Sequence, residues 1–152
     1  MRSAHKFYGK VYKIKIKLND GALIPKKQTQ GSAGYDLHAH LKAPIKIAPG
    51  AIEIIPTGIS LSLPKALEAQ IRPRSGLTTK KIEVKFGTID SDYRGEIKAI
   101  MQNNTQEACI IENGMRIAQL IFNWLPAVEL EEVGELGASE RGSGGLGSTG
   151  VF

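Results

Sequence analysis

Apolar and polar residues alternate along much of this chain with a period of two. Residues 11–18 show the pattern most clearly, because apolar side chains and lysines take turns from Tyr12 to Leu18. Such alternation is typical of a β-strand that buries one face. Shorter apolar and β-branched runs follow it. The pattern predicts strands over residues 11–18, 45–47, 51–55, 59–63, 69–71, 82–84, 97–101, 108–111 and 118–122.

Turn-forming residues separate these runs, as at residues 19–21 (Asn-Asp-Gly) and 112–114 (Glu-Asn-Gly). Short strands at this spacing predict an all-β sandwich, jelly roll or barrel. Helical patterns are scarce. Residues 64–68 can form one turn, and residues 76–81 a short helix with Ser75 as its N-cap. We found no internal repeat and no interdomain linker.

The composition narrows the class of protein. The 152 residues are enough for one domain and too few for two. A single cysteine, Cys109, excludes an intrachain disulfide and a cysteine-rich zinc site. The longest apolar stretches fall short of the roughly 18 residues that cross a membrane, and the N-terminal residues lack the apolar core of a secretory signal. We therefore expect a cytoplasmic protein with no membrane partner.

The excess of positive charge raises the question of whether the protein binds nucleic acid. Lysine and arginine outnumber aspartate and glutamate by 20 to 15, which gives a formal charge of +5. However, Lys13, Lys15 and Lys17 alternate with apolar residues, as on the solvated face of a strand, and the aromatic residues form no stacking cluster. We therefore expect no nucleic-acid partner.

Glycines gather near the C-terminus, where five of the 17 lie within residues 142–150. A segment of this composition is usually a flexible tail. Alternatively, glycine N–H groups and serine and threonine hydroxyls, with Arg141 at their head, suit an arm that wraps around phosphate. The residues alone leave both interpretations open.

The densest polar segment, residues 87–96, lies between two predicted strands and is therefore expected to be a hairpin. A charged hairpin tip is the ordinary interpretation. The alternative is a catalytic base at Asp90, because the flanking Ile89 and Tyr93 would partly desolvate its carboxylate.

Two further segments suit anion binding or a polar cavity. Arg72, Arg74, Ser75 and Gly76 lie between a strand and a possible helix start, where guanidinium and N–H groups can grip phosphate. A capped helix with surface arginines is the alternative. Residues 116–121 place Arg116 and Gln119 in an otherwise apolar strand, which is also compatible with a half-exposed strand. His38 and His40 have strand spacing but no third metal ligand.

Taken together, five ordered segments resemble the motifs of the trimeric dUTP pyrophosphatase (dUTPase) family. They are residues 33–37 (Ala-Gly-Tyr-Asp-Leu), 72–77 (Arg-Pro-Arg-Ser-Gly-Leu), 87–95 (Gly-Thr-Ile-Asp-Ser-Asp-Tyr-Arg-Gly), 116–120 (Arg-Ile-Ala-Gln-Leu) and 141–150 (Arg-Gly-Ser-Gly-Gly-Leu-Gly-Ser-Thr-Gly). Each motif is weak alone, but the ordered set covers most of the chain.

The resemblance implies a β jelly roll or distorted β-barrel with one short helix, assembled as a homotrimer. Residues 1–137 would form the jelly-roll domain. Residues 138–152 would form a flexible glycine-rich arm that closes over a neighbouring subunit's site. Each active site would draw residues from all three subunits.

The resemblance also implies a reaction, the Mg2+-dependent hydrolysis of dUTP to dUMP and pyrophosphate by attack of water on the α-phosphorus. This activity keeps uracil out of DNA and supplies dUMP for thymidylate synthesis. Asp90 would activate the water, and Gln119 would reach the α-phosphate region. Tyr93 would pack under the deoxyribose and exclude a 2′-hydroxyl. Uracil would pair with the backbone of Gly87, Thr88 and Ile89 and of Lys98 on the returning strand.

The remaining motifs would hold the triphosphate. Arg74, Ser75 and Gly76 would bind the α- and β-phosphates, and the arm would bind the γ-phosphate through Arg141, Gly147, Ser148 and Thr149. Leu146 occupies a position where the family usually has a phenylalanine that stacks on uracil, so a weaker arm closure is expected. Mg2+ would be chelated mainly by the phosphates. Asp36 would act on the metal through water or by positioning an arginine.

Two alternatives remain at this point. One is a dCTP deaminase or a bifunctional enzyme of the same superfamily, although the motifs match the hydrolase better. The other is a trimer that binds a partner or a nucleotide without turnover. Intact motif residues other than Leu146 favour the enzyme.

Overall fold

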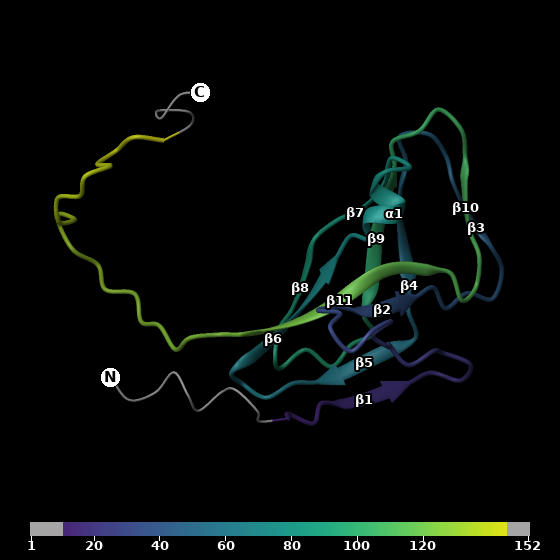
Figure 1. Ribbon diagram of the computed structural model, residues 1–152, viewed down its shortest axis with the longest axis horizontal. Coiled ribbons are helices and arrows are strands. Elements are labelled where there is room, and N and C mark those ends of the chain that lie inside the picture. Colours follow the sequence, from purple (N-terminus) through teal and green to yellow (C-terminus); the bar gives the residue numbers. More distant parts are fainter. Residues whose placement is uncertain (1–10, 146–152) are drawn as a thin grey trace.

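The computed structural model describes residues 11–145, which fold into strands with one short helix. The strands are β1 (Lys15–Leu18), β2 (Tyr35–His38), β3 (Ile45–Ile47), β4 (Ile52–Pro56), β5 (Ile59–Ser62), β6 (Leu67–Arg72), β7 (Ile82–Val84), β8 (Gly87–Ile89), β9 (Lys98–Asn103), β10 (Cys109–Ile111) and β11 (Arg116–Trp124). The helix α1 (Ser75–Thr78) lies between β6 and β7 (Figure 1). The expected all-β class with one short helix is confirmed.

The strands form four antiparallel sheets. The largest has the order β2-β11-β6-β8, and a second has the order β4-β9-β7. The other two are the pairs β1-β5 and β10-β3. The long strand β11 crosses the middle of the molecule and pairs with β2 on one edge and with β6 on the other (Figure 1). This strand therefore connects segments that are distant in the sequence.

Strand β6 shows how the period of two builds the core. Leu67, Ala69 and Ile71 are buried, and the intervening polar side chains are partly exposed. The same alternation in β7 and β9 supplies further buried side chains to one apolar cluster. Burial of alternate residues explains why a sequence pattern with period two was a sufficient signal for most strands.

Several predicted boundaries were wrong. The first strand begins at Lys15, not at residue 11. The expected turn within residues 64–68 is present but shorter, because the N–H of Leu67 donates to the carbonyl of Pro64 and β6 already begins at Leu67. The sequence pattern missed β2, apart from the strand spacing of His38, and it missed β8. Ser75 is not an N-cap, because Arg74 occupies that position in extended conformation and Ser75 is the first helical residue.

The expected hairpin over residues 87–96 is also wrong. Strand β8 pairs with β6, whereas β9 pairs with β4 and β7. The intervening loop therefore crosses from one sheet to another, and its two flanking strands do not form a ladder with each other. The physical reason is that both strands have apolar faces, which pack into the core from different sheets.

Beyond β11 the chain leaves the body of the strands, as the yellow-green trace in Figure 1 shows. Val128, Leu130 and Leu136 are among the most exposed large apolar side chains of the described chain. Within residues 11–145, no helix is long and apolar enough to cross a membrane.

Candidate active site

A carboxylate, Asp36, lies at the centre of a polar cluster on the large sheet. Asp36 belongs to β2 and is only 8% exposed. Its Oδ1 lies 3.2 Å from Nε of Arg74, and its Oδ2 lies 3.4 Å from Nη1 of Arg116. The side-chain amide of Gln28 donates a hydrogen bond of 2.7 Å to the same Oδ2. Both oxygens of the carboxylate are therefore occupied by donors, two of which are cationic.

The sheet register brings these residues together. Strand β11 places Gln119 opposite Asp36 of β2 and opposite Arg72 of β6. Arg74 is the second residue after β6, and its Nη1 donates to the backbone carbonyl of Arg116 at 3.1 Å. Three of the five sequence motifs thus meet at one place because β11 pairs with two strands at once.

Gln119 is held by a backbone contact and by a glycine. Its Nε2 donates to the carbonyl of Pro73 at 2.9 Å. A Cβ atom at Gly34 would lie 3.1 Å from Cβ of Gln119 and would also collide with its side-chain oxygen. A larger residue at position 34 would force the Gln119 side chain to shift. The sequence contained Gly34 within a motif but gave no signal for this role.

Ser75 and Gly76 begin α1 beside Arg74 and are exposed. Two guanidinium groups, a hydroxyl and a carboxamide therefore border the same surface. Guanidinium groups bind phosphate oxygens in a bidentate manner, and hydroxyls donate to them. The predicted residues Arg74, Ser75, Gly76 and Gln119 are thus brought together in an arrangement suited to a polyphosphate.

The sequence missed Gln28. A glutamine in a polar loop carries no periodicity and no spacing that distinguishes it from a solvated residue, and Gln30 nearby is of the same type. Only the folded loop shows which of the two contacts Asp36.

A histidine lies beside this cluster. His38 pairs with Arg116 across β2 and β11, and Nδ1 of His38 is buried without a hydrogen-bond partner among the described residues. Burial lowers the pKa of His38, and the nearby Arg116 and Arg74 lower it further, whereas Asp36 opposes them. His38 is therefore a neutral neighbour of the cluster near pH 7.

The second group of predicted residues lies in the loop between β8 and β9. The backbone N–H of Tyr93 donates to the carbonyl of Asp90 at 3.2 Å, and the Tyr93 hydroxyl donates to the carbonyl of Glu96 at 3.0 Å. The Glu96 carboxylate in turn accepts the N–H of Gly58 at 2.7 Å. These contacts fix the loop against β5. Asp90 itself is exposed, so the expected desolvation by Ile89 and Tyr93 does not occur within the isolated chain.

Backbone edges flank this loop on both sides. Strand β8 is the outermost strand of its sheet, paired only along β6. Strand β9 pairs with β7 only from Met101 onward, so Lys98 at its start has a strand partner on the β4 side alone. Unpaired strand edges offer donors and acceptors at fixed spacing, which is what recognition of a planar base by the backbone requires.

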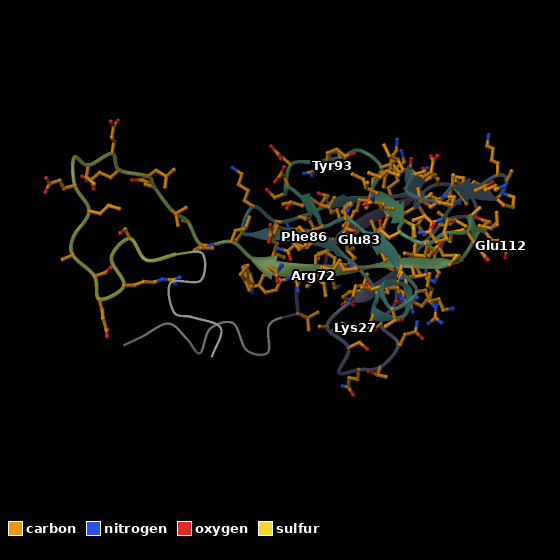
Figure 2. The ribbon with its side chains drawn as sticks, turned by 90° about the horizontal axis from the view of Figure 1, so that it is seen from above. Lys27, Arg72, Glu83, Phe86, Tyr93 and Glu112 are labelled. Atoms are coloured by element: carbon orange, nitrogen blue, oxygen red, sulfur yellow. The ribbon has the colours of Figure 1, made fainter. Side chains whose placement is uncertain are left out.

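Asp90 and Arg74 lie towards opposite ends of β6, although Gly87 at the start of the second group pairs with Ile71 near the end of that strand. Ile89 of β8 pairs with Ala69 near the start of β6, whereas Arg74 lies just beyond the end of β6. The five residues from Ala69 to Arg74 correspond to about 17 Å of extended chain. Figure 2 shows Tyr93 and Lys27, which belong to the loops of the two groups, on opposite sides of the molecule. The structure therefore brings each group together but does not join the two groups.

Residues 11–145 contain no group of three or more histidine, cysteine, aspartate or glutamate side chains that could hold a metal ion. Asp36 is a poor direct ligand, because its two oxygens already accept from Gln28, Arg74 and Arg116.

Part of the predicted arm lies outside the described residues, namely Leu146, Gly147, Ser148 and Thr149. Arg141 lies within them and is exposed, and its Nε donates to the carbonyl of Gly144 at 2.7 Å.

Comparison with known proteins decides the family. The dUTPase family model matches residues 20–150. The chain belongs to the dUTPase family. A deoxyuridine 5'-triphosphate nucleotidohydrolase of Rickettsia massiliae is 51% identical over 142 residues, which cover 91% of this chain and 96% of the relative. The corresponding protein of Rickettsia bellii is 46% identical over 147 residues and covers 93% and 98%.

Solved structures agree with this membership. A mutant dUTPase of Staphylococcus bacteriophage 80alpha with dUpNHpp superposes with a TM-score of 0.82 at 25% identity, covering 93% of this dUTPase chain and all of the phage chain. A mutant dUTPase from phage phi11 of S. aureus, described with a structural Mg(II) ion, gives a TM-score of 0.77 at 21% identity and covers 84% and 100%. The latter similarity concerns the fold alone.

Proposed function

We propose that this dUTPase-family chain hydrolyses dUTP to dUMP and pyrophosphate. The observation that carries the proposal is the family match over residues 20–150, together with the convergence of Arg74, Arg116 and Gln119 around Asp36. A triphosphate is strongly anionic, and this cluster presents cations and donors on one surface. The relatives' name, deoxyuridine 5'-triphosphate nucleotidohydrolase, agrees with the reaction.

In the proposed mechanism Asp90 is the general base. Its carboxylate is exposed at the end of β8 and is free to orient a water molecule. The water attacks the α-phosphorus in line with the leaving pyrophosphate, while Asp90 takes its proton. Because Asp90 is exposed in the single chain, a closed site must exclude bulk water by covering it from outside.

Base and sugar selection would fall to the loop around Asp90. The free edge of β8 at Gly87, Thr88 and Ile89 and the start of β9 at Lys98 would pair with the polar edge of uracil. Cytosine would leave backbone groups unpaired, which is costly in a closed site. The ring of Tyr93, fixed through its hydroxyl, would leave no room for a 2′-hydroxyl.

Phosphate binding would fall to the cluster around Asp36. Arg74, Ser75 and Gly76 would hold the α- and β-phosphates, and Gln119 would direct its amide towards the α-phosphate. Asp36 would act through the arginines, since it contacts both of them. When bound, Mg2+ would neutralise charge on the phosphates, which would be its main ligands. The donor set around Asp36 fits this arrangement and not a direct metal–carboxylate bond.

A homotrimer with shared sites would resolve the separation of the two groups. Since β6 separates the level of Ile89, next to Asp90, from Arg74 by about 17 Å of extended strand, one nucleotide would contact the Asp90 loop of one subunit and the Asp36 cluster of another. Residues 1–137 would form the β domain, and residues 138–152 the arm that closes a neighbouring site with Arg141, Leu146, Gly147, Ser148 and Thr149. The exposed apolar side chains of Val128 and Leu130 favour a partner surface for the segment that leads to this arm.

The decisive experiment is pyrophosphate release from dUTP and Mg2+ by the purified full chain. Asp90→Asn should bind the non-hydrolysable analogue dUpNHpp but release no pyrophosphate. Asp92→Asn, in the same loop and also exposed, is the matched control and should remain active. Ammonia release from dCTP would instead identify a deaminase. Absence of turnover with both nucleotides would contradict an enzymatic function.

A further inference from the structure

Hydrogen bonds on either side of Gln28 restrain the loop that precedes β2. The backbone N–H of Asp36 donates to the carbonyl of Lys26 at 2.9 Å, and the two residues form an isolated antiparallel bridge. Further along the loop, the N–H of Ser32 donates to the carbonyl of Thr29 at 3.1 Å, and the two hydroxyl oxygens lie 2.9 Å apart. Gln28 lies between these two fixed points. Its backbone is therefore restrained even though the residue is exposed.

The side chain of Gln28 makes the shortest of the described contacts to the Asp36 carboxylate. Its Nε2 lies 2.7 Å from Oδ2, compared with 3.2 Å for Arg74 to Oδ1 and 3.4 Å for Arg116 to Oδ2. The carboxylate side chain is 10% exposed, so water has little access to it. Gln28 and Arg116 thus share one oxygen, and the neutral amide has the better geometry.

We propose that Gln28 is a positioning residue that orients the Asp36 carboxylate and keeps Arg116 available to phosphate. The inference rests on the proposed function, because it concerns how the triphosphate is bound. By occupying Oδ2, the amide prevents Arg116 from closing a tight ion pair with Asp36. The guanidinium, which is 47% exposed, keeps donors free for an anionic ligand.

The surrounding charges make this balance sensitive. Arg74 and Arg116 both compete for Asp36, and His38 lies beside them across the strand pair. Without the amide, Oδ2 would be open to Arg116, whose attraction to a partly buried carboxylate is stronger than to water. A guanidinium held in this way binds phosphate less well. The protein would therefore lose affinity for the triphosphate part of the substrate, whereas its contacts with the base and the sugar would not change.

The test is Gln28→Met, which keeps the length of the side chain and removes its donor. We expect the KM for dUTP to rise about fivefold with kcat within twofold of wild type, because the arginines bind substrate and transition state alike. The inhibition constant of 2′-deoxyuridine, which carries no phosphate, should not change. Gln30→Met is the matched control, since Gln30 is an exposed glutamine of the same loop; its KM should equal that of wild type.

A second variant, Gln28→Glu, places a carboxylate where the amide was. It should draw the arginines further from the substrate and raise the KM for dUTP tenfold or more, whereas Gln30→Glu should not. A KM in Gln28→Met or Gln28→Glu equal to that of its control would overturn the proposal. Equal losses for dUTP and 2′-deoxyuridine, or a matching fall in Tm, would overturn it too by indicating a merely structural role.

These results are separable from the proposed function. If the wild-type chain did not hydrolyse dUTP, the proposed function would fail, but calorimetric affinities for dUpNHpp would still test Gln28. A fivefold weaker affinity of Gln28→Met would support the positioning role, and an unchanged affinity would overturn it.

Discussion

Nε of Arg74 lies 3.2 Å from Oδ1 of Asp36, so the second residue after β6 is ion-paired with β2. These strands are not neighbours in the sheet, because β11 lies between them. The pair therefore spans β11 and fixes the start of α1, which carries Ser75, relative to the strand that carries Gln119. Since the carboxylate also contacts Arg116, one buried acid determines where two guanidinium groups lie.

Asp36→Asn should weaken triphosphate binding, because the charge that orients Arg74 and Arg116 is lost. We expect the KM for dUTP to rise at least tenfold, with a smaller change in kcat. Stability should fall by about 1–2 kcal/mol, less than for a fully buried pair, because Arg74 and Arg116 are 27% and 47% exposed and can be hydrated. Steady-state kinetics and denaturant unfolding measure the two effects. Asp20→Asn, at an exposed turn, is the control; an unchanged KM in Asp36→Asn would contradict the role of the pair.

Most strands could be predicted because their alternation reports burial of one face. The sequence pattern did not predict strands β2 and β8, for physical reasons. In β2 the charged Asp36 and its neighbour Leu37 are both buried. Polar residues therefore do not coincide with exposed positions, and the alternation that reveals a strand is absent. Strand β8 begins with Gly87, which packs closely against Ile71 of β6. Because glycine has no side chain, it adds nothing to the alternation of apolar and polar residues.

The sequence named candidate site residues but not their arrangement in space. The order of the motifs identified Arg74, Asp90 and Gln119, yet only the register of β6 and β8 shows that Asp90 and Arg74 lie at opposite ends of one strand. A linear pattern contains no information on register between distant segments. For the same reason it could not distinguish Gln28 from Gln30.

Gly34→Ala should disturb Gln119 without unfolding the sheet. The added Cβ would lie within 3.1 Å of Cβ of Gln119 and would push its amide away from the carbonyl of Pro73. Loss of one oriented donor at a phosphate typically slows the reaction, so we expect kcat to fall roughly 10- to 100-fold. Gly31→Ala is the matched control, since a Cβ there would meet no heavy atom within 4 Å. Equal kcat values for the two variants would show that Gln119 tolerates the added methyl group.

Tyr93→Ala should relax the discrimination between dUTP and UTP. The ring is fixed by the hydrogen bond from its hydroxyl to the carbonyl of Glu96, at 3.0 Å, and packs closely over Gly95. Its removal opens space for a 2′-hydroxyl, so the ratio of kcat/KM for dUTP to that for UTP should fall at least about tenfold. Tyr93→Phe keeps the ring and should keep the ratio. If Tyr93→Ala retained full selectivity, sugar selection would have to reside in another residue.

A chain that ends at Ala138 should lose turnover but keep its fold. Among the described residues after β11, residues 125–145, nearly all are exposed and none contributes a side chain to the apolar core, so the Tm should change by less than about 3 °C. Without the arm the proposed γ-phosphate ligands are missing, and pyrophosphate release should fall at least about 100-fold. A chain that ends at Gly150 is the control and should stay active. Unimpaired turnover of the shorter chain would refute the arm assignment.

His38 should make the folded protein less stable as the pH falls below neutrality. Burial, aided by Arg116 and Arg74, holds the pKa of His38 below its ordinary value of 6.5. Near and below pH 6.5 the unfolded chain therefore binds more protons at this residue than the folded chain, so the free energy of unfolding decreases with decreasing pH. The stabilisation by neutral His38 is present above that pH and is lost below it. Urea unfolding at pH 7.5 and 5.5, at one fixed protein concentration, should show a larger decrease for wild type than for His38→Gln. Equal decreases in the two proteins would show that His38 does not carry this pH dependence.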